Sequence, residues 1–180
     1  MKRTTKYFGV VELGCNSVNP FYFHTFYKEC RIDISIEPYA VNVYNPDLVW
    51  EIIDKYAEIH EIAKKAIIEK FCEKDNDVYY FFKHHFDYIP YKEYLDEYLF
   101  EKFGVKDFEK IDIKTFVEKM YYPSLDIAFK VSEDNKVDDK ITVSLEYFVF
   151  NSGSDNDIFL YVFLNEELNV IGFEVKWGFP

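Results

Sequence analysis

The hydrophobic pattern of the chain changes period, and this change limits the fold to a mixture of helices and strands. In the last third, residues 124–131, 143–149 and 171–177 alternate between apolar and polar side chains, as half-buried strands do. Ile158–Leu164 is continuously apolar, which is typical of a central strand covered on both faces. Polar connections at about 132–140, 151–157 and 165–169 separate these runs. Together they predict a four-stranded antiparallel meander packed on helices.

The first part of the chain predicts strands followed by a long helix. Residues 7–12 are expected to form a first strand that pairs with residues 21–27, and residues 31–37 alternate strictly. A shorter strand follows at 40–44. Asn45-Pro46-Asp47 then marks a helix start, because Asn accepts a hydrogen bond at the N-cap and Pro fits the first helical position. Apolar residues recur at helical spacing from there to about Phe71.

The centre of the chain predicts shorter, aromatic helices. Asp75-Asn76-Asp77 is a second N-cap cluster, followed by a helix over 78–88. Another helix follows Pro90 and ends near Gly104, and Asp112 caps a last one that runs through Met120. The predicted fold class is therefore α+β, with residues 1–180 as a single domain: N-terminal strands and a long helix, central helices, and a C-terminal four-stranded antiparallel meander packed on helices.

Composition excludes several classes of protein. The 180 residues are 49% hydrophobic and 30% charged, which excludes a disordered chain. No apolar run approaches the roughly 20 residues that cross a bilayer, and no secretory signal is recognisable, so we expect a cytoplasmic protein without membrane contact. A net charge of −12 repels phosphate backbones, so no nucleic-acid partner is expected. The same charge would attract a basic protein partner.

No motif predicts catalysis, a metal or a cofactor. His60-Glu61 begins an H-E-x-x-H pattern, but the fifth position is Lys64, so the zinc motif fails. His84 and His85 are adjacent, and on a helix they point about 100° apart. A metal site assembled from the four histidines by tertiary folding stays an open alternative. The three cysteines are widely spaced and form no C-x-x-C.

One group of acidic residues breaks a local rule. Glu93, Glu97 and Glu101 follow one another at helical i,i+4 spacing, with Asp96 beside them. Like charges at this spacing cost about 0.2–0.5 kcal/mol per pair. A solvated face of an acidic protein explains the pattern most simply. The functional interpretation is an acidic ridge on which a basic partner docks, with Glu93, Asp96, Glu97 and Glu101 as candidate partner-binding residues.

Three segments resemble a bacterial family known as domain of unknown function 2004. They are the opening residues 7–13, the alternating strand 32–36 with the helix 48–71 behind it, and the closing strands around 158–163 and 173–175. The resemblance spans most of the chain and implies a small cytosolic protein, but it transfers no catalytic residue. By size, acidity and aromatic content the chain is also similar to immunity proteins of bacterial toxin systems, an analogy of class rather than motif.

The sequence does not decide the function, and three hypotheses stay open. The leading one is a protein-binding module, immunity-like in type, that presents an acidic, aromatic-rich surface to a basic partner. The alternative is a small-molecule-binding protein or hydrolase with a site between helices and sheet, where Cys72, His84 and His85 would be the first residues to inspect. The third is a homodimer joined through aromatic surface.

Overall fold

The computed structural model describes residues 2–12, 21–37, 46–87, 97, 101, 104, 110–118, 120, 122–131, 137–147 and 158–177. At residues 84–87, 129–131, 137–140 and 177 the description covers the backbone alone. The chain divides into two compact units. Unit 1 contains Met1–Ile62, Tyr122–Glu146 and Val162–Gly172, and unit 2 contains Ala63–Tyr121, Tyr147–Tyr161 and Phe173–Pro180. One helix and three strands have residues in both units, and the prediction of a single domain stays a prediction.

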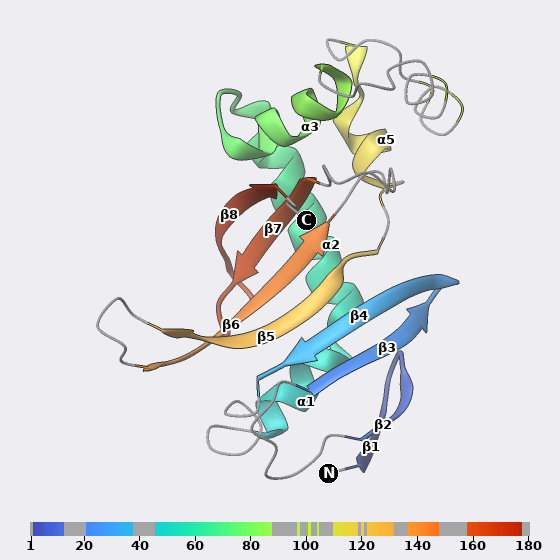
Figure 1. Cartoon of the computed structure of the whole chain (residues 1–180), viewed down its shortest axis with the longest axis vertical. Coiled ribbons are helices and arrows are strands. Elements are labelled where there is room, and N and C mark those ends of the chain that lie inside the picture. Colours follow the sequence, from blue (N-terminus) through green and yellow to red (C-terminus); the bar gives the residue numbers. More distant parts are fainter. Residues whose placement is uncertain are drawn as a thin grey trace. The chain divides into compact units, whose positions relative to one another are not determined.

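The elements confirm the α+β class. In chain order they are β1 (Lys2–Thr5), β2 (Gly9–Glu12), β3 (Phe21–Tyr27), β4 (Cys30–Ile36), α1 (Pro46–Asp54), α2 (Tyr56–Cys72), α3 (Asp77–Asp87), α5 (Ile113–Glu118), β5 (Ser124–Val131), β6 (Val137–Tyr147), β7 (Ile158–Leu164) and β8 (Val170–Trp177) (Figure 1). Within the described residues, no helix is both long and apolar enough to cross a membrane.

The strands β3 to β8 form one six-stranded sheet in the order β3-β4-β5-β6-β7-β8. The last four strands form the predicted C-terminal meander. The sheet is nevertheless mixed, because β4 and β5 pair in parallel over Ile34–Leu125, Ser35–Asp126 and Ile36–Ile127. The sequence predicted the N-terminal strands and the meander without this connection. Strand β6 also begins at Val137, inside the segment predicted as a turn.

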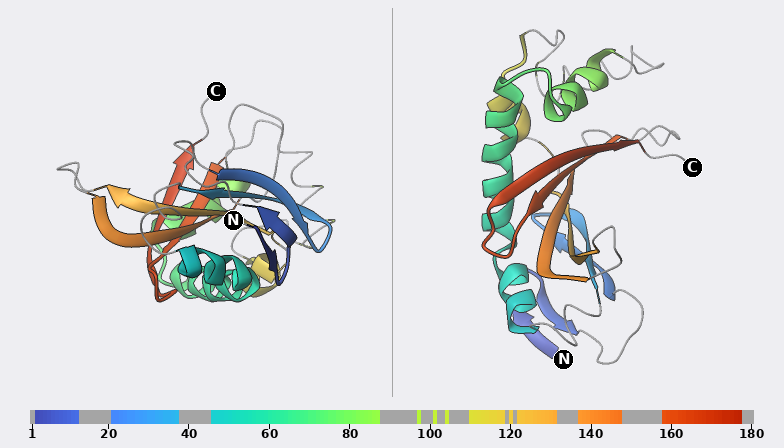
Figure 2. Two further views of the ribbon diagram at one scale, coloured as in Figure 1. Left: turned by 90° about the horizontal axis from the view of Figure 1, so that it is seen from below. Right: turned by 90° about the vertical axis from the view of Figure 1, so that its left-hand side faces the viewer.

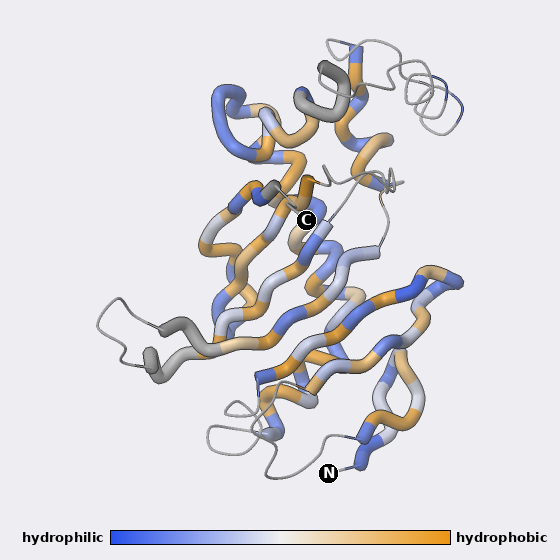
Figure 3. Tube along the Cα trace, in the orientation of Figure 1, coloured by the Kyte–Doolittle hydropathy of each residue, from blue (hydrophilic) through white to orange (hydrophobic). Residues whose placement is uncertain are grey.

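Side chains alternate between a buried and a more exposed face along the strands. The hydropathy of the residues alternates with them, as the colours along β3 and β4 show (Figure 3). The buried face of unit 1 is apolar and includes Ile32, Ile34, Ile36, Leu125, Ile127, Val143 and Leu145. Strand β7 alternates as well, because Ile158, Leu160, Val162 and Leu164 are buried and the residues between them are half-buried. Strand β7 therefore lies inside the sheet, as predicted, with one face buried and the other half-buried.

The N-terminal strands pair differently from the prediction. Residues 7–12 do not form one strand paired with β3; instead β2 pairs with β1 in a separate two-stranded sheet. The hairpin turns at Gly9, whose φ is +68°, a conformation that glycine adopts readily. The Thr5 hydroxyl accepts a hydrogen bond from the Phe8 amide (3.1 Å) and donates one to the Gly9 carbonyl (3.0 Å). These contacts fix the turn.

Strand β3 pairs with β4 across the two-residue turn Lys28-Glu29. Both residues have positive φ, +46° and +68°, as a type I′ hairpin turn requires. A two-residue turn fixes the register of the whole hairpin. As a result, His24 lies opposite Asp33 and Phe26 lies opposite Arg31.

In unit 1, α1 and the first turns of α2 lie on one side of the sheet (Figures 1 and 2). Helix α1 begins at Pro46 as predicted, and Glu51 pairs with Lys55 at 2.6 Å. The predicted long helix is interrupted at Lys55, whose amide lies within reach of two carbonyls, Glu51 O (3.0 Å) and Ile52 O (3.1 Å). This is the tighter hydrogen bonding with which many helices end.

Tyr56 lies at the centre of an aromatic cluster in unit 1. Its side chain is fully buried. Its ring packs edge-on against Phe8 and Tyr27, with ring centroids 5.2 and 5.5 Å away. Its hydroxyl donates to the Pro123 carbonyl at 2.6 Å. Tyr56 therefore links the N-terminal hairpin, strand β3 and the start of β5.

Phe82 lies at the centre of an aromatic cluster in unit 2. It is fully buried on α3, and its ring meets Phe71 of α2 at 5.6 Å and Phe116 of α5 at 5.3 Å. Helices α3 and α5 start where the sequence predicts. Asn76 Oδ1 accepts from the Tyr79 amide (3.1 Å) at the start of α3, and the Asp112 carbonyl accepts from the Phe116 amide (2.9 Å) at the start of α5.

Candidate functional site

The strand register gathers polar residues on one face of the sheet in unit 1. Tyr22 pairs with Ser35, Ser35 with Asp126, and Asp126 with Ser144. Residues opposite one another in register share a face of the sheet, and this face points away from the buried apolar one. We call it the polar face. It comprises Tyr22, His24, Phe26, Arg31, Asp33, Ser35, Glu37, Ser124, Asp126, Ser144 and Glu146.

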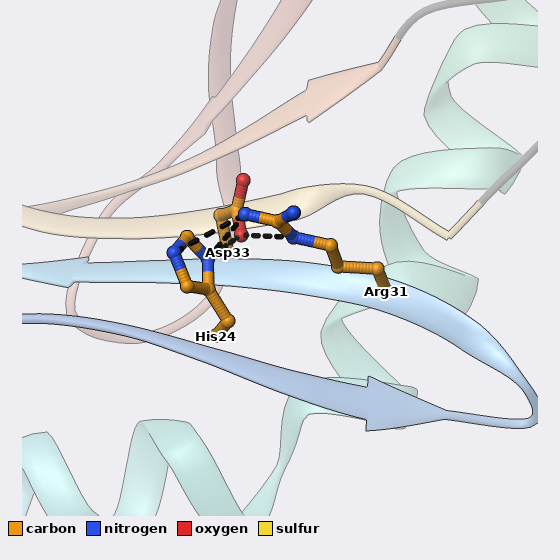
Figure 4. A network of polar contacts seen from close by, with 3 residues as sticks. All are labelled: His24, Arg31 and Asp33. Atoms are coloured by element: carbon orange, nitrogen blue, oxygen red, sulfur yellow. Dashed lines mark hydrogen bonds and ion pairs between the residues drawn. The ribbon is translucent and has the colours of Figure 1, made fainter.

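A three-residue network connects β3 and β4 on the polar face (Figure 4). His24 Nδ1 is hydrogen-bonded to Asp33 Oδ1, and Arg31 Nε donates to the same oxygen at 3.3 Å. Arg31 Nη2 lies 2.8 Å from Nδ1 and 3.1 Å from Nε2 of the same imidazole ring. The network therefore joins the imidazole, the guanidinium and the carboxylate on two neighbouring strands.

The network stabilises the charged form of Asp33. Burial by itself would raise the pKa of the Asp33 carboxyl, but hydrogen bonds from His24, Tyr22 and Arg31 outweigh it, and the pKa lies below its ordinary value. Tyr22 responds in the opposite direction. Burial and the nearby negative charge of Asp33 raise the pKa of its phenol. Asp33 is therefore an ionised carboxylate at neutral pH, beside a neutral Tyr22 hydroxyl.

The network does not have the arrangement of a catalytic triad. A triad needs the second nitrogen of the histidine to face a hydroxyl nucleophile. Here Arg31 faces the Nε2 atom of His24, and the nearby Ser35 hydroxyl is hydrogen-bonded to Asp126 instead. Within the part of the chain that the structure describes, no group of three or more His, Cys, Asp or Glu side chains is placed to hold a metal ion. The polar face therefore offers charged groups and aromatic rings for contact with another molecule.

Asp126 is the carboxylic acid of the polar face whose pKa is raised. Burial raises the pKa of its carboxyl; the hydrogen bond from Ser35 opposes this rise, and the negative charges of Glu37 and Glu146 add to it. Together with Asp33, these residues place four carboxylates and one guanidinium on the face. The face is therefore acidic, and one of its carboxylates is ionised at a cost to the folded state.

Asp126→Asn is expected to raise the free energy of unfolding at neutral pH by about 0.5–2 kcal/mol, the range of surface-charge improvements. A carboxyl with a raised pKa binds its proton more tightly in the folded chain than in the unfolded one, so stability falls as the pH rises through the raised pKa. The amide of Asn removes this cost and can still accept from Ser35. Urea unfolding at several pH values is the measurement. The gain should disappear towards the ordinary aspartate pKa of about 3.9; an equal gain at every pH would contradict the explanation.

Two large aromatic side chains stand exposed beside this acidic group. Tyr22 is 59% exposed and Phe26 is 67% exposed, and both lie on β3 on either side of His24. The Tyr22 ring meets the His24 ring edge-on at 5.0 Å. Because aromatic anchors with polar surroundings are typical of protein interfaces, the polar face combines both properties that the sequence analysis expected of a binding surface.

The candidate residues of the acidic ridge are only partly described. Glu97 and Glu101 are helical and exposed, whereas Glu93 and Asp96 lie outside the described residues. The ridge therefore stays a prediction. Cys72 is exposed at the end of α2, and the side chains of His84 and His85 lie outside the described residues. The described residues therefore do not test the alternative site at these three positions.

The failed zinc motif has a structural role instead. His60 and Lys64 are both buried, one turn apart on α2. The His60 ring lies 5.0 Å from the Tyr122 ring, and Lys64 Nζ donates to Glu118 at 3.0 Å. His60 therefore packs within unit 1, and Lys64 forms its ion pair within unit 2.

The sequence analysis did not predict the network, because His24 and Asp33 lie on two different strands. Two signals could have found it. The strict alternation of 31–37 places Arg31 and Asp33 on the polar side of one strand. The short connection Lys28-Glu29, read as a two-residue turn, would have placed His24 opposite Asp33. Asp126 could not be placed on the polar face from the sequence, because β4 and β5 are far apart in the chain. It joins the face through the parallel pairing of these two strands.

Comparison with known proteins adds no assignment: no family model, no curated protein and no solved structure matches the chain. The resemblance to the bacterial family therefore stays a prediction.

Proposed function

We propose that the chain is a protein-binding module whose polar face receives a basic segment of a partner protein, with immunity-like binding as the general type. The observation that carries the proposal is the exposure of Tyr22 and Phe26 beside the acidic group. Large exposed aromatic side chains are costly to leave in water, and they supply most of the affinity where they are buried by a partner. The carboxylates supply charge complementarity and speed the encounter.

The state of Asp126 also supports this function. A half-buried carboxylate with a raised pKa, beside Glu37 and Glu146, lowers the stability of the free protein. Groups kept at a cost to stability are concentrated at functional sites. A lysine or arginine from a partner would relieve the repulsion among the three carboxylates, so the cost in the free protein becomes affinity in the complex.

A titration with a defined probe tests the proposal. The probe is a peptide that alternates arginine and valine, added to isotope-labelled protein and followed by NMR. We expect the largest amide shift changes at polar-face residues of β3, β4 and β5, and none with a peptide that alternates glutamate and valine. Added salt should weaken the binding, because the charges lie near solvent.

Variants separate the contributions of charge and aromatic surface. The double variant Asp126→Asn, Glu146→Gln is expected to weaken peptide binding about tenfold, and Tyr22→Ala by about tenfold or more. The matched control Glu69→Gln, Glu167→Gln removes the same net charge from exposed positions elsewhere and should leave the Kd nearly unchanged. Shift changes confined to other elements, or equal effects of the two double variants, would overturn the proposal.

A further inference from the structure

Strand β3 is an edge of the six-stranded sheet. Among the strands that the structure describes, only β4 pairs with it. In an antiparallel pair, alternate residues of an edge strand point their backbone N–H and C=O groups away from the neighbouring strand. Seven consecutive residues, Phe21–Tyr27, pair with β4 without a bulge. The outer edge of β3 is therefore a regular template for one more strand.

The sheet has a second edge at β8, and the two edges differ in chemistry. Proteins protect edge strands with charged residues, prolines or bulges. Strand β8 carries exposed Glu174 and Lys176, which pair at 3.2 Å, and it has Gly172 in its interior. Strand β3, with the sequence F-Y-F-H-T-F-Y, contains no proline and no Asp, Glu, Lys or Arg. Only β3 lacks these protections.

The sequence of β3 is complementary to itself. Two copies that overlap over all seven residues in antiparallel register place His24 opposite His24 at the centre. The same register places Tyr22 opposite Phe26 on the polar face and Phe21 opposite Tyr27 on the other face. Opposed aromatic pairs each contribute roughly 0.2–1 kcal/mol in antiparallel sheets. Each such pair occurs twice in a two-fold symmetric arrangement.

We propose that β3 binds β3 of a second copy of this chain, antiparallel, about a two-fold axis that passes beside His24. The two sheets continue into one another, and Tyr22 of each copy lies opposite Phe26 of the other, with one such pair on each side of the dyad. The polar faces of the two copies then lie on the same side of the joined sheet. The inference goes beyond the proposed function and does not depend on it.

Salt separates this association from the binding of a basic partner. Each copy carries a net charge of −12, so two copies repel one another, and screening of this repulsion strengthens the dimer. The binding of a basic peptide weakens under the same conditions. The two proposals can therefore fail independently.

Sedimentation equilibrium of the full chain over a range of concentrations tests the dimer. We expect a monomer–dimer equilibrium that shifts towards the dimer with added salt. Phe26→Lys introduces an edge lysine next to the dyad and is expected to raise the dissociation constant at least tenfold. Ile171→Lys is the matched control, because Ile171 is similarly exposed (57%) but lies on β8, and it should leave the equilibrium unchanged. A monomer at all concentrations, or a dimer that Phe26→Lys does not weaken, overturns the proposal.

A disulfide tests the register. In the proposed register the Cα atoms of the two copies of residue 24 lie about 4.5–5.5 Å apart, within the range that a disulfide bridges. The two copies of residue 22 lie about 13 Å apart, four residues along the strand. His24→Cys is therefore expected to cross-link into a covalent dimer under mild oxidation, and Tyr22→Cys is not. The unsubstituted chain under the same oxidation controls for the natural cysteines. Equal cross-linking of the two variants contradicts the register.

Discussion

Replacing Tyr56 by alanine is expected to lower the free energy of unfolding by about 3–5 kcal/mol, the usual cost of removing a large buried aromatic side chain. The ring is fully buried, and it packs edge-on against Phe8 and Tyr27. The substitution also removes the hydroxyl that donates to the Pro123 carbonyl. The loss therefore combines a cavity with a broken buried hydrogen bond.

Urea unfolding followed by circular dichroism measures this loss, and two further variants separate its parts. Tyr56→Phe keeps the ring and removes the hydroxyl, so it should cost only about 1 kcal/mol. Tyr80→Ala removes a tyrosine that is 52% exposed and should change stability by less than about 0.5 kcal/mol. If Tyr56→Ala costs no more than Tyr56→Phe, the aromatic cluster does not support unit 1 as described.

The second large effect is expected in unit 2. Phe82→Ala should also cost about 3–5 kcal/mol, because the ring is fully buried between Phe71 and Phe116, at 5.6 and 5.3 Å. Phe82→Leu retains much of the volume and should cost clearly less. Thermal and urea unfolding of the three proteins provide the measurement, and similar losses for the alanine and leucine variants would contradict this account.

The two alanine variants together also test the predicted single domain. Tyr56 lies in unit 1 and Phe82 in unit 2. If residues 1–180 unfold as one cooperative domain, both substitutions lower the midpoint of one shared transition. If the units unfold separately, each substitution lowers the midpoint of one transition and leaves the other in place.

Local signals in the sequence predicted the helices well. The side-chain oxygens of Asn76 and Asp112 accept from backbone amides within one turn, and the ring of Pro46 fixes a helical φ. The information for these helix starts is therefore contained in nearby residues. The alternating runs near the C-terminus likewise predicted the meander. The class and most element types follow from these short-range patterns.

Strand pairing was harder to predict, because it depends on residues that are distant in the chain. Nothing near Ile34 indicates that it pairs with Leu125, and nothing in residues 7–12 excluded pairing with β3. Residues 9–12 pair with β1 instead, because the positive φ of Gly9 allows a tight local hairpin. The polar face was missed for the same reason, because its carboxylates come from both sides of the long connection between β4 and β5.

The parallel pairing of β4 with β5 has a consequence for synthesis of the chain. Ile34 and its partner Leu125 are separated by roughly ninety positions, and such contacts form slowly because a long loop must close first. During translation, which adds about 5–20 residues each second, the β3–β4 hairpin emerges several seconds before β5. The edge of β4 that later pairs with β5 stays unpaired throughout that time. The nascent chain should therefore be a substrate for ribosome-associated chaperones until β5 has left the exit tunnel.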